Sequence, residues 1–185
     1  ALQSEFDALK NDEAIRAVIL EGAGKAFCAG HDLKEMTAGR QAEDGGKAYF
    51  KTLFNRCAKM MQTIQKLPQP VIAQVHGIAT AAGCQLVASC DLAVAAEGTK
   101  FGVNGVNIGL FCSTPMVALS RNISRKKTFE MLVTGDFINA MEAKEAGLVN
   151  HVTSVEMLSH KTDEISAKIC EKFKRDNSLN YEPSQ

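Results

Sequence analysis

The stretch from Gln74 to Ala96, QVHGIATAAGCQLVASCDLAVAA, constrains the fold of this chain more than any other. An apolar run typical of a strand, Val71 to Val75, meets a break at His76-Gly77, and small residues from Ala79 to Gly83 then open a helix that ends near Ser89. Small side chains let another molecule approach the backbone, and the first turn of a helix carries free N–H donors with a partial positive charge. The stretch therefore predicts a place where a developing oxyanion can be held.

The same arrangement occurs once earlier in the chain. Ala17 to Leu20 is a short apolar run, typical of a parallel strand buried on both faces, and a glycine-punctuated loop follows it. A helix is expected to start near Asp32, which is a suitable cap, so that the N–H of His31 can point outward. Two such units side by side in one sheet would each present a backbone N–H to the same point, which predicts a two-donor oxyanion hole.

Composition limits what kind of protein carries this arrangement. The chain has 185 residues, of which 45% are hydrophobic, and this is enough for one domain with a sizeable core. Its 21 basic and 21 acidic side chains give a net charge of zero, so nucleic acid and anionic membranes are not expected partners. No apolar run reaches the roughly 18 residues of a membrane helix and no secretion signal is seen, so we expect a soluble, intracellular protein.

The six cysteines form neither a CxxC pair nor a metal-ligand cluster. We therefore expect buried free thiols in a reducing compartment, and no metal site. His76, at the end of a strand, is expected to be a structural histidine. The polar, glycine-rich segment Thr37 to Lys47 predicts a mobile surface loop that could act as a lid.

Periodicity places the remaining elements. The apolar stripe between Phe50 and Ile64 predicts a helix whose stripe is a core face and not a cofactor-binding surface. Further helices are expected at 2–9, from about 116, at 128–133, 140–146 and 156–175, strands at 91–95 and 147–149, a glycine- and asparagine-rich connection at 101–110, and a polar tail at 176–185.

Four motifs, in order and at matching spacing, make the chain resemble the crotonase, or enoyl-CoA hydratase/isomerase, family. They are AFCAGHDLKEM at 26–36, PVIAQVHGIATAAGCQLVASCDLAVAA at 70–96, FGVNGVNIGL at 101–110 and TGDFINAMEAKEAGLVNHV at 134–152. The resemblance implies an α/β fold, a repeated ββα superhelix, with a core domain at 1–155 and a C-terminal helix and tail at 156–185. Relative to that fold, we expect the first strand and most of the C-terminal helices to be missing.

The resemblance also implies a site. In the family, two backbone N–H groups polarise a thioester carbonyl, and here they would belong to His31 and Ala82, with Gly83 permitting close approach. Coenzyme A would lie against Ala29, His31, Asp32 and Leu33, with Lys34 near the nucleotide, although Lys34 could equally be a solvated helix lysine. The acyl-CoA thioester would be a substrate, and no separate cofactor is implied.

The chain departs from the family at both catalytic glutamates, and in this it resembles the enoyl-CoA hydratase domain-containing members that lack them. The family's GCE reads Gly83-Cys84-Gln85 here, and its FGxPE reads 101–105 with Gly105 last. Neither Gln85 nor Gly105 exchanges a proton near neutral pH. The aspartate that some isomerases and dehalogenases of the family use is Ser113 here. The polar residues left near the expected acyl pocket are Gln85, Asn104, Asn107, Cys112, Ser113 and Thr114, of which Gln85 could orient a substrate or a water.

Two functions from different classes fit this pattern. One is an acyl-CoA enzyme of fatty-acid metabolism that stabilises an enolate without the glutamate pair. The other is a catalytically impaired CoA-ester-binding or regulatory protein. The family further implies a homotrimer or dimer of trimers, and a cytoplasmic location in a bacterium or, after removal of a targeting segment, the mitochondrial matrix in a eukaryote.

Overall fold

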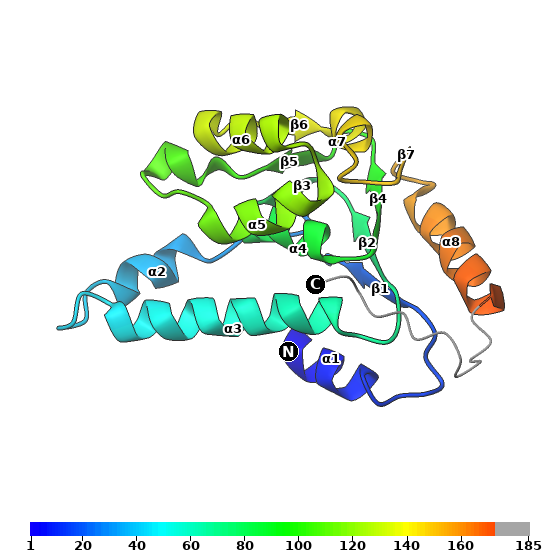
Figure 1. Cartoon of the computed structure of the whole chain (residues 1–185), viewed down its shortest axis with the longest axis horizontal. Coiled ribbons are helices and arrows are strands. Elements are labelled where there is room, and N and C mark those ends of the chain that lie inside the picture. Colours follow the sequence, from blue (N-terminus) through cyan, green and yellow to red (C-terminus); the bar gives the residue numbers. More distant parts are fainter. Residues whose placement is uncertain (173–185) are drawn as a thin grey trace.

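The computed structural model describes residues 1–172 and is built around two sheets (Figure 1). The first is fully parallel, with strand order β1-β2-β4-β7. Its strands are β1 (Val18–Glu21), β2 (Val71–Val75), β4 (Leu92–Ala96) and β7 (His151–Thr153). The second sheet joins β3 (Ile78–Thr80), β5 (Lys100–Gly102) and β6 (Ile138–Asn139), with β3 and β5 parallel and β5 and β6 antiparallel. The protein therefore has the mixed α/β architecture that the sequence predicted.

Alternation along β2 separates the two faces of the parallel sheet. Val71, Ala73 and Val75 belong to the main core, whereas Ile72 packs with Val94 on the opposite face. The strand predicted at 71–75 is confirmed, and all five residues of β2 are buried. Helix α8 (Leu158–Lys172) covers the opposite face, and Figure 1 shows it beside the sheet, away from α3, α4 and α5.

The other helices lie on the main-core side or at the ends of the molecule. They are α1 (Leu2–Leu9), α2 (Leu33–Gly39), α3 (Lys47–Gln65), α4 (Ala82–Ser89), η1 (Asn104–Ile108, a 3-10 helix), α5 (Ser113–Asn122), α6 (Arg125–Thr134) and α7 (Ala140–Ala146). Local sequence fixes their ends: Asn139 and Glu142 form a capping box at the start of α7, and Gly135 and Gly147 end α6 and α7 in the left-handed conformation.

Several expectations require correction. The strand predicted at 17–20 is parallel, but Val18 and Ile19 are only half-buried because β1 pairs with a single neighbour at the edge of the described sheet. Short elements were missed: β3 lies in what the sequence suggested was the opening of α4, and β5 and η1 lie in the expected connection at 101–110. The predicted last strand forms a few residues later, as β7.

The polar segment at 37–47 is shorter as a loop than predicted, because α2 runs to Gly39 and α3 begins at Lys47. The stripe of α3 is a core face only near its C-terminal end, where Met61 and Ile64 are buried. Phe54 is 45% exposed, so its assignment to the core was wrong. The first half of α3 extends beyond the body of the molecule, together with α2 (Figure 1).

The helix expected at 156–175 begins at Leu158, and its end and the tail at 176–185 lie outside the described residues. Within residues 1–172, no helix combines the length and apolar character needed to cross a membrane. The same residues contain no group of three histidine, cysteine or carboxylate side chains placed to hold a metal ion.

Candidate functional site

The turn into α4 is the centre of the site. Ala81 has φ 51° and ψ −118°, an unusual conformation for a residue with a side chain, and its N–H donates to Gly102 O at 2.9 Å. The first intrahelical bond is made by Gln85 N, which donates to Ala81 O at 3.1 Å. Because the amides before Gln85 have no carbonyl behind them in the helix, the N–H of Ala82 stands at the open end of α4.

The segment that carries His31 is attached to this turn by backbone pairing. Cys28 forms a parallel bridge with Ala79: its N–H donates to Ile78 O at 3.1 Å, and Thr80 N donates to Cys28 O at 3.0 Å. Two residues further on, Gly30 adopts φ +90°, and a Cβ added to it would lie 3.4 Å from Ala82 N. The residue just before His31 therefore lies against the start of α4.

Neither of the two predicted donors is used inside the protein. Within residues 1–172, the backbone N–H groups of His31 and Ala82 make no hydrogen bond. Buried amides are nearly always paired, whereas amides at a helix start or loop can be left for water or a ligand. The chain thus places two backbone amides without an internal acceptor among the described residues on adjoining segments. Their role as an oxyanion hole stays a prediction.

Gly83 has a different role from the one expected. A Cβ at this position would overlap the carbonyl oxygen of Cys28, so the close approach that glycine permits is made by the protein's own backbone. The missing side chain lets α4 dock against the Cys28 bridge. Gly83 therefore holds the two segments together and does not make room for a ligand on that side.

The residues predicted to contact coenzyme A lie at the start of α2. The Asp32 side chain accepts from Lys34 N at 2.7 Å and Glu35 N at 3.3 Å, so it caps the helix as predicted. Ala29, Leu33 and Lys34 are exposed, and His31 is half-buried. The carboxylate of Asp32 is thus occupied by the backbone, while its neighbours face solvent.

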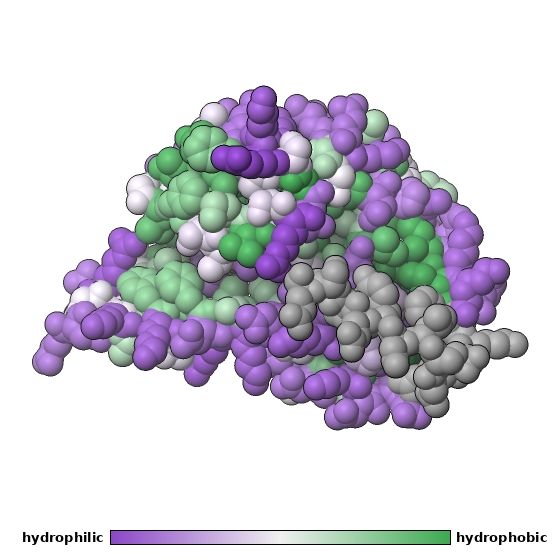
Figure 2. Space-filling view, in the orientation of Figure 1, coloured by the Kyte–Doolittle hydropathy of each residue, from purple (hydrophilic) through white to green (hydrophobic). Residues whose placement is uncertain are grey.

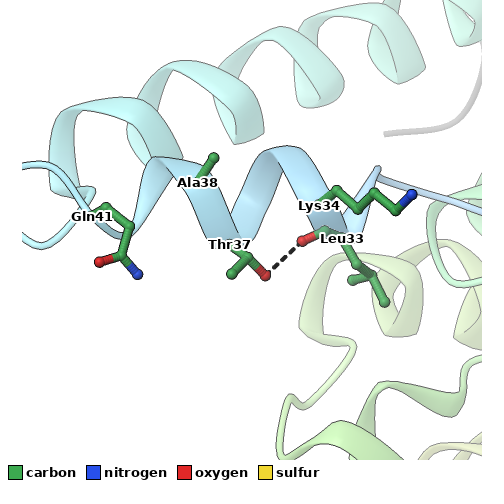
Figure 3. A pocket seen from close by; sticks show the side chains of 5 residues that line it. All are labelled: Leu33, Lys34, Thr37, Ala38 and Gln41. Atoms are coloured by element: carbon green, nitrogen blue, oxygen red, sulfur yellow. Dashed lines mark hydrogen bonds between the residues drawn. The ribbon is translucent and has the colours of Figure 1, made fainter.

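A shallow depression of about 480 Å³ runs along α2 and is lined by Leu33, Lys34, Thr37, Ala38 and Gln41. Figure 3 shows Leu33, Thr37 and Gln41 projecting from one side of the helix, with Thr37 Oγ1 bonded to Leu33 O at 2.7 Å. The Lys34 ammonium extends away from them and is not fixed by an ion pair to any described residue.

The His31 ring is part of an aromatic cluster that sequence reasoning missed. It meets Phe54 edge-on, with ring centroids 5.7 Å apart, and Phe54 stacks with Phe50 at 6.1 Å. The guanidinium of Arg40 lies 5.8 Å from the Phe50 ring. Burial lowers the pKa of His31, so its imidazole is neutral at pH 7. The signal that could have revealed the cluster is the spacing of Phe50 and Phe54, one helical turn apart, directly after the polar loop.

Gln85 follows Ala82 by three residues on α4. Its side chain is 8% exposed, and its Oε1 atom is buried without a hydrogen-bond partner among residues 1–172. The adjacent Cys84 is fully buried, and this burial raises the pKa of its thiol to about 12, so the thiol stays protonated. Neither side chain can remove a proton near neutral pH.

Gly105, the second position at which the chain lacks a family glutamate, lies in η1. It has no room for a side chain. A Cβ there would meet Leu110 O at 2.7 Å and Cys112 Sγ at 2.8 Å. Asn104, next to it, accepts from Thr80 Oγ1 at 2.7 Å, so it is tied to the second sheet. Within the described residues, no hydrogen bond links Cys112 or Ser113 to a histidine, and His76 is bonded to Gly24 O at 2.7 Å, in agreement with its expected structural role.

A larger depression, of about 940 Å³, lies between α5 and α6 and does not include the predicted site residues. Figure 2 shows apolar side chains gathered on the part of the surface where these helices lie. The exposed apolar residues of this region include Val117, Phe129 and Val133, of which Phe129 is 60% exposed.

Residues 1–178 match the family model of enoyl-CoA hydratase/isomerase. The chain belongs to this family. Relatives in the family include the mitochondrial enoyl-CoA hydratase domain-containing protein 3 of Xenopus laevis, which is 49% identical over 171 residues that cover 92% of this chain and 56% of the relative. The human protein of the same name is 47% identical over 171 residues, which cover 91% of this chain and 54% of the relative.

Solved structures of family members are similar throughout the described fold. A crystal structure of an enoyl-CoA hydratase from Mycobacterium smegmatis has 56% sequence identity and a TM-score of 0.86, over 91% of this chain and 63% of the other. The crystal structure of human enoyl-CoA hydratase domain-containing protein 3 has 45% identity and a TM-score of 0.85, over 92% and 65%. The chain spans about half the length of the curated relatives it matches. The predicted crotonase-family membership and fold are confirmed.

Proposed function

We propose that this member of the enoyl-CoA hydratase/isomerase family binds an acyl-CoA thioester and stabilises an enolate in an oxyanion hole formed by the N–H groups of His31 and Ala82. The observation that carries the proposal is the presence of two unpaired backbone donors on adjoining segments, held together by the Cys28–Ala79 bridge. A thioester enolate concentrates negative charge on one oxygen, and two fixed donors stabilise that charge more than they stabilise the neutral carbonyl.

The chemistry open to such a site is restricted by what surrounds the donors. General acid-base catalysis of proton removal or water addition needs a side chain that exchanges protons, and Gln85 and Gly105 offer none. Hydration by a glutamate pair is therefore not part of the proposal. Isomerisation, decarboxylation or another reaction that passes through an enolate remains, provided that the substrate or solvent supplies the proton transfer.

The coenzyme A moiety is proposed to lie along the start of α2, from Ala29 to Lys34. The exposed apolar side chain of Leu33, 54% accessible, and the depression beside it support this position. Asp32 would contribute by holding the helix start and not by direct contact, because both of its recorded bonds are to backbone amides.

A test of the donors replaces the amide at Ala82 by an ester, with lactic acid incorporated in place of alanine. The matched control is the same change at Ala88, in the same helix but away from its open end. The measurement is the infrared carbonyl stretch of a ¹³C-labelled butyryl-CoA thioester. We expect a shift to lower wavenumber on binding, which the ester at position 82 reduces and the ester at 88 leaves intact. An undiminished shift in the Ala82 ester would refute the assignment of this donor.

The ester at position 82 should lower the rate of turnover more than it lowers the affinity for the ligand. One oxyanion donor typically contributes about 3 to 4 kcal/mol to the stabilisation of a transition state. Loss of one neutral hydrogen bond to the bound ester weakens affinity only about 3- to 10-fold. A substrate panel of acyl-CoA esters, followed by coenzyme A and acyl product analysis, would show whether any reaction depends on the Ala82 amide.

The lack of space for a side chain at Gly105 favours a second function. In this alternative the protein binds CoA esters, or acts as a regulatory protein, without turning them over. Acyl-CoA binding by calorimetry together with no turnover on the substrate panel would establish it, and failure to bind any ester at millimolar concentration would exclude both functions.

The biological setting is proposed from the family. A role in fatty-acid metabolism follows from acyl-CoA as ligand. A homotrimer or dimer of trimers is testable by analytical ultracentrifugation, and the exposed apolar residues on α5 and α6 are available to such contacts. The names of the vertebrate relatives support a mitochondrial location if the chain is eukaryotic, and a cytoplasmic location is proposed if it is bacterial.

A further inference from the structure

His31 carries an imidazole whose nitrogens have no partner in the protein. The ring is half-buried, and within residues 1–172 neither nitrogen makes a hydrogen bond. The ring of His76, in contrast, is bonded to Gly24 O at 2.7 Å. Buried polar side chains usually have a protein or water partner, so an imidazole that is partly buried and unbonded is available to a ligand.

The imidazole is also fixed in place and reachable. Its ring lies edge-on to Phe54 at 5.7 Å between centroids, and Phe54 stacks on Phe50 of the same helix. The chain is held on both sides of the residue, by Gly30 against the start of α4 and by the Asp32 cap of α2. Part of the His31 surface remains accessible, so a ligand at this turn can meet the ring.

A ligand held by the His31 amide lies close to the His31 ring as well. Only Cα and Cβ separate the ring from the backbone nitrogen, and only the carbonyl carbon separates a thioester oxygen from the acyl carbon beside it. With that oxygen about 2.9 Å from His31 N, as in an ordinary hydrogen bond, the acyl carbon lies in the neighbourhood of the ring. Of the chain's four histidines, the others follow β2 or lie on β7 and α8.

No charged side chain of the described residues occupies the imidazole. The titratable side chains on the adjoining turns are Asp32, Lys34 and Glu35 on α2, Arg40 beyond it, and Lys51 and Cys57 on α3. Within residues 1–172 none of them forms an ion pair or hydrogen bond with the ring. Burial lowers the pKa of His31, so at pH 7 the imidazole is in the neutral form that accepts a proton.

We propose that the His31 imidazole is the acid–base group of this site and removes a proton from the carbon next to the thioester carbonyl. The C–H electron pair becomes the double bond of the enolate, the carbonyl π pair moves to the oxygen held by the His31 and Ala82 amides, and the proton moves to a ring nitrogen. The imidazolium then returns it to the same carbon or, in an unsaturated chain, to a conjugated one, and the carbonyl is restored.

This inference rests on the proposed function, because it assumes that the thioester oxygen lies at the His31 amide. Without the imidazole, the proton transfer would fall to the substrate or solvent. A neutral imidazole is a weak base and the C–H group next to a thioester is a weak acid. The two oxyanion donors reduce this mismatch, since they stabilise the enolate that proton removal creates.

The test measures exchange of the C2 hydrogens of butyryl-CoA in D₂O by mass spectrometry, a reaction that needs a base and an enolate but no particular product. We expect wild-type exchange faster than in buffer, constant at neutral pH and falling in solutions more acidic than the ordinary histidine pKa of about 6.5, where the ring is protonated. His31→Gln keeps the backbone N–H and should slow exchange about 10²- to 10⁴-fold. Its butyryl-CoA affinity and carbonyl-stretch shift should persist.

His151→Gln is the matched control. It makes the same substitution at another histidine whose pKa burial lowers, on β7 opposite Val94 and outside the site, and should leave the exchange rate unchanged. If His31→Gln does not fold, His31→Ala takes its place. Free imidazole should restore part of the exchange in His31→Ala, beyond what the same imidazole produces without protein.

The outcomes separate the two proposals. Wild-type binding with a carbonyl shift but no exchange above buffer overturns the role of His31 and leaves the oxyanion hole standing. Exchange that survives in His31→Gln with its pH profile unchanged also overturns that role, because another group then takes the proton. No binding of butyryl-CoA at millimolar concentration removes the proposed function itself, and this inference with it.

Discussion

Ala81 holds a conformation that alanine rarely adopts, directly before the Ala82 donor. It is the only residue other than glycine with positive φ among residues 1–172. Such a conformation costs about 1–3 kcal/mol and persists only where the surroundings impose it, as at functional sites. Here Ala81 is fixed on both sides, by its bond to Gly102 and by the close approach of Gly30.

Ala81→Gly is expected to stabilise the protein by about 1 kcal/mol. Glycine adopts this conformation without strain, and the gain exceeds the added entropy of the unfolded chain, about 0.4–1 kcal/mol. Urea denaturation, analysed with an unchanged m-value, measures the difference. A loss of stability would mean that packing of the Ala81 methyl against Gly30 outweighs the strain.

Cys84 and Cys90 should be unreactive in the folded protein, even in alkali. Burial raises both thiol pKa values to about 12, compared with about 8.5 for a free cysteine. Since the folded pKa is above the unfolded one, the protonated thiols favour the folded state at neutral pH, and this contribution is lost as pH rises from about 9 toward 12. Iodoacetamide at pH 9.5, followed by peptide mass analysis, should label these two only after unfolding. Rapid labelling of either in the folded chain would contradict its burial.

Glutamates placed at 85 and 105 should not create a good hydratase. Gln85→Glu adds a carboxylate in a buried site, and Gly105→Glu also forces a Cβ against Leu110 O and Cys112 Sγ. Overpacking of this kind costs about 1–3 kcal/mol. The double variant is therefore expected to melt at a lower temperature and to hydrate crotonyl-CoA at a rate close to that of the wild type. Efficient hydration would show that η1 rearranges readily and that only the two carboxylates were missing.

At the scale of elements, α4 is positioned by its close docking on the Cys28 bridge. Gly83→Ala should destabilise the chain by about 1–3 kcal/mol and speed hydrogen exchange at the amides of Cys28 and Thr80, because the new methyl overlaps Cys28 O. Gly24→Ala is the control, since a Cβ there meets nothing within 4 Å. If both variants are equally stable, the docking is looser than this geometry indicates.

Helices and strands whose formation is determined by local sequence could be predicted. Short strands that form only by hydrogen bonding to a strand distant in sequence could not. The apolar run of β2 was predicted correctly because its length and composition act locally. The small residues from 79 to 83 predicted only the opening of α4, but the first two of them belong to β3. β3 and β5 are three residues each and exist because they pair with each other, at Ala79 opposite Phe101. No local pattern distinguishes them from loop.

The site divides in the same way. Asp32 could be recognised as a cap because capping depends on neighbouring residues. The assignment of two donors to His31 and Ala82 came from the family resemblance and stays a prediction. The role of Gly83 and the lack of room at Gly105 depend on atoms that are distant in sequence, Cys28 and Leu110, and only the folded structure brings these together.

At the scale of the whole molecule, the parallel sheet needs covering on both faces. One face carries the main core, and the other places Ile72, Val94 and Ala96 against α8, with Leu158 6% exposed among them. The sequence analysis expected a boundary at residue 155 between a core domain and a C-terminal segment. This boundary separates α8 from the sheet face that the helix covers. Arg16 adds a polar link, since its guanidinium donates to Cys170 O at 3.0 Å.

A chain truncated after Val155 should therefore fail to fold as an independent domain. Ile72 and Val94 are fully buried in the intact protein, and removal of α8 would expose them in the middle of the sheet. Leu158→Ala is the milder test, with an expected loss of about 2–3 kcal/mol, because it removes buried side-chain atoms and leaves a cavity on the sheet face. His160→Ala, on an exposed position of the same helix, is the control and should change stability little. Dye binding to exposed apolar surface and urea denaturation measure these effects, and cooperative unfolding of the truncated chain would instead establish residues 1–155 as a self-sufficient core.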